Sequence, residues 1–187
     1  MKRYLILMVL SIVLVACSDD NSSDSGITDN VGQSESDTSS NGGIKEYSIG
    51  DTAVITSDLY DFHYEVTVTD FQLTREVDGV KIEDYLTGAR ETHRFAVIDV
   101  TIKNITDSSY IPNEMFSANF AKETERAGDT DEDQFFTIAD QELGAGEELS
   151  GHIVYIINLD DSQEFKLKYE INTDEETHFV LPMPESE

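Results

Sequence analysis

The sequence predicts an all-β sandwich, and three observations carry that prediction. Apolar side chains recur at every second residue in several short segments, as they do in strands with one buried face. Turn residues such as Asp78-Gly79 and Gly144-Ala145-Gly146 separate those segments. No long stretch shows a capped period of about 3.6 residues. We therefore expect helix only as a single turn around Glu83–Leu86.

Two segments alternate most clearly between apolar and polar residues. In His63–Phe71, the apolar side chains of Tyr64, Val66 and Val68 share one face, opposite glutamate and threonine side chains. In Phe165–Ile171, apolar residues alternate with lysines and a glutamate. That pattern indicates an outer strand whose charged side chains face water.

Other segments carry apolar residues more densely. Phe95–Lys103 alternates only after an apolar start, which predicts a strand covered on both faces at one end. Ile153–Ile157 is apolar throughout, the pattern of a central buried strand. Shorter strands are predicted at four further places: Thr52–Thr56, Met115–Ala121, Phe135–Ala139 and His178–Leu181.

The first residues are similar to a bacterial lipoprotein signal. Lys2 and Arg3 precede an apolar run that ends at Ala16, and a membrane-spanning helix would need about 20 apolar residues. The run closes with Leu14-Val15-Ala16-Cys17, which resembles the lipobox. That resemblance implies cleavage before Cys17 and lipid on its sulfur. Cys17 is the single cysteine, so no disulfide can form within the chain. The alternative is an ordinary secretory signal that ends in cysteine.

These features divide the chain into three parts. We expect a lipoprotein signal peptide (1–16), a lipidated cysteine with a disordered linker (17–45), and one domain (46–187). The linker is rich in Ser, Asp, Asn and Gly, a composition that cannot bury enough apolar surface to fold. Its roughly 28 residues would span on the order of 30 Å.

The charge balance excludes two classes of partner. The chain has 39 acidic and 12 basic residues and a formal net charge of −27. This charge opposes binding to nucleic acid and broad contact with anionic lipid headgroups. We therefore expect a monomer with no nucleic-acid partner, held on the extracytoplasmic face of the cell membrane by its lipid anchor alone.

Two segments resemble a known family. Arg94–Asn104 reads RFAVIDVTIKN and precedes a turn, and Leu143–Ile157 reads LGAGEELSGHIVYII. Together with Met115–Lys122, they resemble the immunoglobulin-like domains of unknown function found on many Gram-positive lipoproteins. The same fold occurs in the mycobacterial immunoprotective extracellular antigen. Gly146-Glu147 and Gly151 match the family's second element, whereas Ala145 stands where proline is usual and Tyr155 where phenylalanine is common.

The resemblance covers about Tyr47 to Leu181. It implies an immunoglobulin-like antiparallel β-sandwich of about 7–9 strands. The family has no established catalytic residues, so none can be carried over, and we expect no enzyme activity.

A cluster of carboxylates supplies the one candidate metal site. Asp129, Asp131 and Asp133 alternate near a glycine, and Asp140 stands at the twelfth position counted from Asp129, as in a calcium loop. Gln134 occupies the position where such a loop needs glycine. A solvated acidic loop is therefore the alternative. We expect no cofactor other than calcium.

Other chemically active residues show no catalytic or zinc-binding spacing. The four histidines are too far apart in sequence for a short zinc motif: His63, His93, His152 and His178. Ser150-Gly151-His152 lacks the spacing of a nucleophile elbow. Aromatic residues near carboxylates could form a rim for a peptide or sugar, or fill the core: Tyr60, Phe62, Tyr64 and Tyr85, near Asp58, Asp61 and Asp84.

The function predicted from the sequence is that of a membrane-tethered binding or accessory module with an envelope protein as partner. Its working surface would be its loops, including 78–92 and 122–134. The alternative is a calcium-binding or envelope-stress protein that uses its acidic loops.

Overall fold

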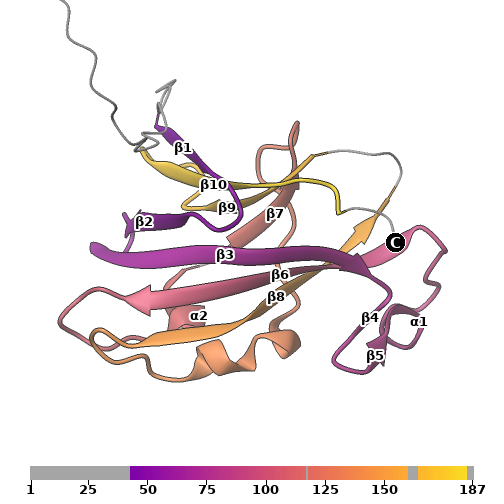
Figure 1. Ribbon diagram of the computed structural model, residues 1–187, viewed down its shortest axis with the longest axis horizontal. Helices are drawn as coiled ribbons and strands as arrows, with labels where there is room; N and C mark the ends of the chain where they lie inside the picture. Colours follow the sequence, from indigo (N-terminus) through magenta and orange to yellow (C-terminus); the bar gives the residue numbers. More distant parts are fainter. Residues whose placement is uncertain (1–42, 117, 160–163, 185–187) are drawn as a thin grey trace, which may run out of the picture. The chain divides into compact units, whose positions relative to one another are not determined.

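Two four-stranded sheets face each other in the computed structural model, which describes residues 43–116, 118–159 and 164–184 (Figure 1). Cys17, with the predicted signal and nearly all of the predicted linker, lies outside the described residues. The first sheet has the order β2-β3-β6-β8, with every neighbouring pair antiparallel. Its strands are β2 (Thr52–Ser57), β3 (Phe62–Thr74), β6 (His93–Asn104) and β8 (Glu148–Asn158).

The second sheet has the order β1-β10-β9-β7. Its strands are β1 (Ile44–Tyr47), β10 (Glu176–Leu181), β9 (Phe165–Tyr169) and β7 (Ala118–Lys122). The β1–β10 pair is parallel and the other two pairs are antiparallel. The sandwich predicted from the sequence is therefore confirmed, although one of its pairings is parallel. β1 also begins at Ile44, inside the predicted linker.

Short elements connect the strands. A two-stranded ribbon, β4 (Glu76–Val77) and β5 (Val80–Lys81), leads into the one-turn helix α1 (Ile82–Tyr85). This turn confirms the helix expected around Glu83–Leu86. A second turn, α2 (Pro112–Met115), begins with proline and precedes β7.

The main core lies between the sheets. Alternate residues of β3, Tyr64, Val66 and Val68, are fully buried and meet Leu167 and Phe179 of the second sheet within one cluster. Burying a large apolar side chain contributes about 1.5–3 kcal/mol, so this alternation fixes which face of β3 turns inward.

A second, smaller core covers the outer face of the first sheet. Phe95 and Val97 of β6 pack there against Ile82, whereas Ala96 and Ile98 face the main core. The dense start of β6 is thus a strand buried on both faces at one end, as its sequence predicted.

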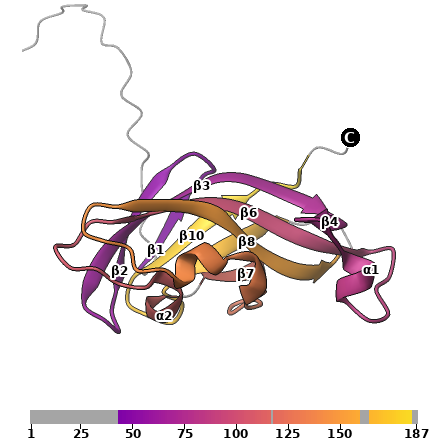
Figure 2. The same ribbon diagram turned by 90° about the horizontal axis from the view of Figure 1, so that it is seen from below.

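The predicted strand Phe135–Ala139 is wrong. The segment forms two 3₁₀ turns, η1 (Asp133–Phe135) and η2 (Thr137–Asp140), in orange beside β8 in Figures 1 and 2. Phe136 and Ala139 are its buried residues, and their three-residue spacing suits a 3₁₀ turn. Phe136 lies over Gly151, where an added Cβ would come within 2.7 Å of the ring. The glycine in the family-like segment is therefore needed for this packing.

The prediction that Phe165–Ile171 is an outer strand is also wrong. β9 lies between β10 and β7, and Lys168 is only 4% exposed. The Lys168 ammonium donates to the carbonyl oxygens of Glu125 and Arg126, so the loop after β7 covers this part of the sheet. Lys168 alternates with apolar residues as a solvent-facing residue would, but its side chain faces this loop rather than water.

Candidate ligand-binding groove

A groove of about 780 Å³ opens at the end of the sandwich where β2 turns into β3. Two segments far apart in the sequence form its walls, the turn that leads into Phe62 and the stretch from Ile105 to Tyr110 after β6. Val54 and Thr56 of β2 and Lys45 of β1 complete it. The groove therefore borders one of the two edge strands of each sheet, β1 and β2.

A chain of aromatic rings runs from the rim of the groove into the core. Tyr60 is 44% exposed, and its ring centroid lies 6.3 Å from that of Phe62. Phe62 in turn lies 4.9 Å from Tyr110 and 5.7 Å from Tyr64. Tyr64 is fully buried and stacks on Phe116 at 4.1 Å. Of the aromatics considered as a rim, Tyr60 and Phe62 thus line a groove and Tyr64 fills the core.

Tyr85 belongs elsewhere. Its ring packs against Phe95 and Phe135, and its hydroxyl donates to Glu132 Oε2 at 2.5 Å. That hydrogen bond, with burial and the negative charge of Glu132, raises the pKa of Tyr85 to about 12.

A buried asparagine holds one wall of the groove. Asn104 is 0% exposed, and its Nδ2 donates to the carbonyl oxygens of Ser108 (2.7 Å) and Leu143 (3.0 Å). Its Oδ1 accepts from the backbone N–H and the hydroxyl of Thr106, at 2.9 and 2.8 Å. The side chain therefore shapes the 105–109 loop and joins it to Leu143, with both its amide nitrogen and its oxygen in use.

The opposite wall is tied to α2. The Tyr60 hydroxyl donates to the carbonyl oxygen of Glu114 at 3.2 Å, and Asp61 occupies the left-handed region with φ of 54°. Asp and Asn tolerate that conformation better than most residues, which suits this turn.

The hydroxyl groups that line the groove include those of Thr56 and Tyr110. Thr56 Oγ1 and His63 Nδ1 lie 3.0 Å apart, but among the described residues no hydrogen bond orients the other ring nitrogen of His63. The Tyr110 hydroxyl is buried without a hydrogen-bond partner in that part of the chain, and burial raises the pKa of Tyr110 to about 12. A neutral phenol beside apolar walls can bind a ligand, but it is not an activated nucleophile.

The four aspartates of the predicted calcium loop are dispersed. The backbone of Asp129 pairs with Phe120, Asp133 begins η1, and Asp140 accepts from Asn113 Nδ2 at 2.8 Å. Asp131 is half-buried, and burial raises the pKa of its carboxyl. Within the described ranges, no group of three or more metal-ligating side chains lies close enough together to hold an ion.

The histidines are likewise separate. His93 Nδ1 accepts from the Arg90 N–H at 2.8 Å. His152 lies 2.9 Å from Asp78, and His178 lies 3.0 Å from Glu176. Ser150 pairs with the Thr101 hydroxyl at 2.8 Å rather than with His152.

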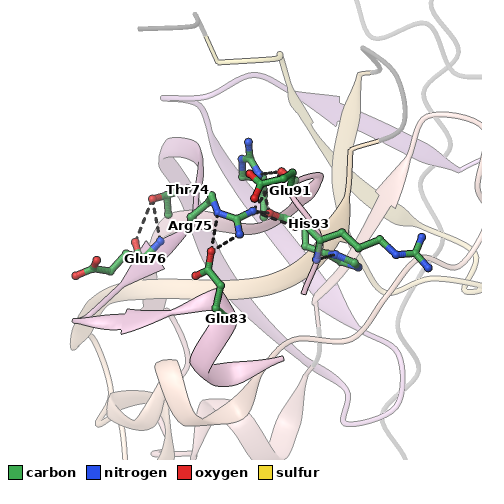
Figure 3. Close-up of polar contacts among 8 residues, drawn as sticks. Thr74, Arg75, Glu76, Glu83, Glu91 and His93 are labelled. Carbon is green, nitrogen blue, oxygen red and sulfur yellow. Dashed lines mark hydrogen bonds and ion pairs between the residues drawn. The ribbon is translucent and has the colours of Figure 1, made fainter. Parts of the chain in front are cut away.

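Arg75 holds the other predicted working loop, 78–92, in a folded arrangement (Figure 3). Its Nη1 donates to the carbonyl oxygens of Arg90, Glu91 and His93, at 3.0–3.2 Å. The other side of the guanidinium pairs with Glu83 of α1. Hydrogen bonds from Arg75 thus hold this loop, whereas the groove exposes apolar side chains.

In the part of the chain that the structure describes, no helix is long and apolar enough to cross a membrane.

The sequence matches one family model, that of the domain of unknown function DUF4352, over residues 58–177. The search of curated proteins gave no match.

Several solved structures are distantly similar. One is a Bacillus subtilis protein described as a candidate lipoprotein, at 14% identity and a TM-score of 0.46, with 69% of this chain covered. The match spans only 38% of that protein's length. A β-sandwich protein from Clostridium difficile is 14% identical (TM-score 0.45), with 76% of this chain and 97% of that chain covered. A secreted protein from Mycobacterium tuberculosis, MPT63, is 15% identical (TM-score 0.41), with 75% and 97% covered.

Proposed function

The chain belongs to the DUF4352 family, whose function is unknown, and we propose a function from the geometry of the chain itself. The protein is a lipid-anchored, extracytoplasmic binding module and not an enzyme. Its groove takes an extended segment of another envelope protein, one that carries apolar side chains next to Lys or Arg.

The distribution of exposed apolar side chains carries this proposal. Four of the seven large apolar side chains that are exposed in the described residues line the groove or lie on its turn: Val54, Leu59, Tyr60 and Ile105. Leu59 is 79% exposed. Single exposed apolar residues are normal on a protein surface, but a cluster around a hollow is typical of a binding site.

The neighbouring strand edge supports an extended ligand. β2 is the outermost strand of its sheet, so its outer backbone groups have no partner strand among the described residues. A peptide strand can pair with such an edge while its alternate side chains enter adjacent hollows. The formal charge of −27 favours a ligand with Lys or Arg, because long-range attraction speeds its approach.

Site-specific photocrosslinking in intact membranes tests the groove. A benzophenone amino acid at Leu59 should give a defined adduct, whereas the same probe at Ile138, which is 43% exposed and does not line the groove, should not. The adduct should disappear when Tyr60→Ser and Ile105→Ser are combined, and should weaken at high salt. The adducted peptide should carry alternating apolar residues next to Lys or Arg. Equal adducts at both positions, or an adduct that survives the groove substitutions, would reject the proposal.

The anchor is tested separately. Cys17→Ser should move the protein from the membrane fraction to the soluble fraction or leave it unprocessed, and the neighbouring change Ser18→Ala should do neither. Two or more acyl chains hold a protein durably, since each buried methylene contributes about 0.8 kcal/mol. If the Cys17→Ser protein is still cleaved and still anchored, the lipobox interpretation fails.

A further inference from the structure

A second cavity, of about 240 Å³, lies between β7, β9 and the segment that contains η1. It shares no lining residue with the groove. Its walls are largely apolar, with Ile102, Phe116, Phe136 and Ile153 among them. At about 30 Å³ for each water-sized group, it has room for a ligand of about eight non-hydrogen atoms.

Several polar side chains also line this cavity. Asp131 and Asp133 contribute carboxylates, and no ion pair joins either of them to a basic residue within the described ranges. Asn113 also lines the cavity. Its Nδ2 donates to Asp140 Oδ1, so its own Oδ1 is the atom that can act as an acceptor for a ligand. The cavity therefore offers hydrogen-bond acceptors and no side-chain cation.

A buried hydroxyl without a partner provides the independent sign of a ligand. Tyr169 lines the cavity and is 1% exposed, yet its Oη has no hydrogen-bond partner among the described residues. Burial raises the pKa of Tyr169, and the negative charge of the nearby Asp131 carboxylate acts in the same direction. Buried polar groups are nearly always paired in folded proteins, and one left unpaired at a cavity calls for a bound group.

We propose that this cavity binds a small organic amine in its ammonium form, with an aliphatic or aromatic body. An ammonium head has three N–H donors, which match the Asp131 and Asp133 carboxylates and the Tyr169 oxygen. The rings of Phe116 and Phe136 attract a cation at their faces and pack against the ligand's apolar part. Calcium fits less well, because it takes six to eight oxygen ligands and most of this wall is apolar.

The test titrates the full-length chain with two amines, benzylamine and isopentylamine, and with the neutral alcohols of the same shape, followed by backbone amide chemical shifts. We expect saturable binding of at least one amine, with shifts centred on residues 130–136 and on β9. Each matching alcohol should bind at least about tenfold more weakly, because a hydrogen bond from a charged donor is stronger than one from a neutral hydroxyl. No saturable binding by either amine, or equal affinity for amine and alcohol, overturns the proposal.

Three single substitutions localise the site. Asp131→Asn should weaken amine binding about tenfold, whereas Asp129→Asn, which removes the same charge two residues away, should leave it unchanged. Tyr169→Phe should weaken binding severalfold without lowering the stability of the free protein, because the hydroxyl it removes is unpaired. Unchanged affinity in Asp131→Asn, or calcium chloride alone producing the same shifts at 130–136, would show that the amine site is wrong.

Discussion

Asn104 shows how one residue can set the shape of the groove. It ends β6 fully buried, and it is the last residue of the segment that resembles the family's strand. Its side-chain hydrogen bonds to Thr106 and Ser108 satisfy backbone groups of the 105–109 loop, and its bond to Leu143 joins this loop to the segment before β8. A buried polar residue is costly unless it is satisfied in this way.

Asn104→Ala should lower the free energy of unfolding by about 2–6 kcal/mol, because four hydrogen bonds of about 0.5–1.5 kcal/mol each are lost. Urea denaturation followed by fluorescence measures this change. Asp107→Asn, on the same loop but exposed, should change stability by less than about 0.5 kcal/mol. Similar stabilities for the Asn104→Ala protein and the wild type would mean that the loop is held by other contacts.

His178 is the residue whose titration should be visible in stability. It is 5% exposed, and burial lowers its pKa below the ordinary 6.5, with Lys168 and Lys166 acting in the same direction and Glu176 against it. The unfolded chain therefore binds the proton more readily than the folded protein does. Stability that is present above about pH 6.5 should be lost as the pH falls below that value.

Urea denaturation between pH 8 and pH 5 should show this loss in the wild type and a reduced loss in His178→Gln. The same substitution at an exposed histidine, His63→Gln, is the matched control. Burial raises the pKa of Glu170 and Asp131, and these groups act in the opposite direction as the pH falls, so the comparison is made between variants. Parallel curves for the wild type and His178→Gln would show that His178 does not contribute.

At the scale of elements, one cross-strand row explains why the second sheet is hard to infer from its sequence. Glu46, His178, Lys168 and Asn119 are successive partners across β1, β10, β9 and β7. The last three are buried although all are polar. Charged side chains in a strand usually face water, but here a loop covers the outer face of the sheet and buries them.

Arg75 holds the loop after β5 through hydrogen bonds to its carbonyl oxygens, as Lys168 does for the loop after β7. Arg75→Met should speed amide exchange across residues 82–92 by more than tenfold, or about 1.4 kcal/mol in local opening free energy, since several carbonyl oxygens lose their donor. Hydrogen–deuterium exchange with mass spectrometry resolves that segment. Lys81→Met removes the same charge from the neighbouring ribbon and should have little effect. If both variants exchange alike, charge rather than the guanidinium contacts holds the loop.

At the scale of the whole molecule, the large negative net charge affects stability. A formal charge of −27 on 187 residues produces self-repulsion in the compact state. Ion pairs such as Lys166–Glu46, at 2.6 Å, use the basic residues at particular places, but 12 basic residues cannot neutralise 39 acidic ones.

Raising sodium chloride from about 0.01 to 0.15 M should therefore stabilise the protein, because the Debye length falls from about 30 to 8 Å. Thermal unfolding at fixed pH measures the shift, which should level off once screening is complete. A melting temperature that falls as salt is added would mean that local ion pairs outweigh the general repulsion.

The candidate groove was only partly foreseeable. The sequence places Tyr60 and Phe62 near carboxylates, but nothing in their spacing separates them from Tyr64, which is buried in the core. Ile105 and Tyr110 lie more than 40 residues further along the chain, and only the pairing of β3 with β6 brings them to the same end of the sandwich. The cavity beside Tyr169 gave no sequence signal, because Tyr169 lay in an ordinary alternating strand.

The sequence by itself determined the all-β class, the faces of β3 and the double covering of β6, because alternation of side chains and local turns are properties of a few neighbouring residues. It also supplies the prediction that Cys17 is lipidated. Only the tertiary structure decided that β9 is an inner strand, that β1 joins in parallel and that Phe135–Ala139 forms 3₁₀ turns over Gly151. Periodicity reports which side chains share a face. What covers that face, whether a sheet, a loop or water, depends on partners that are distant in the sequence.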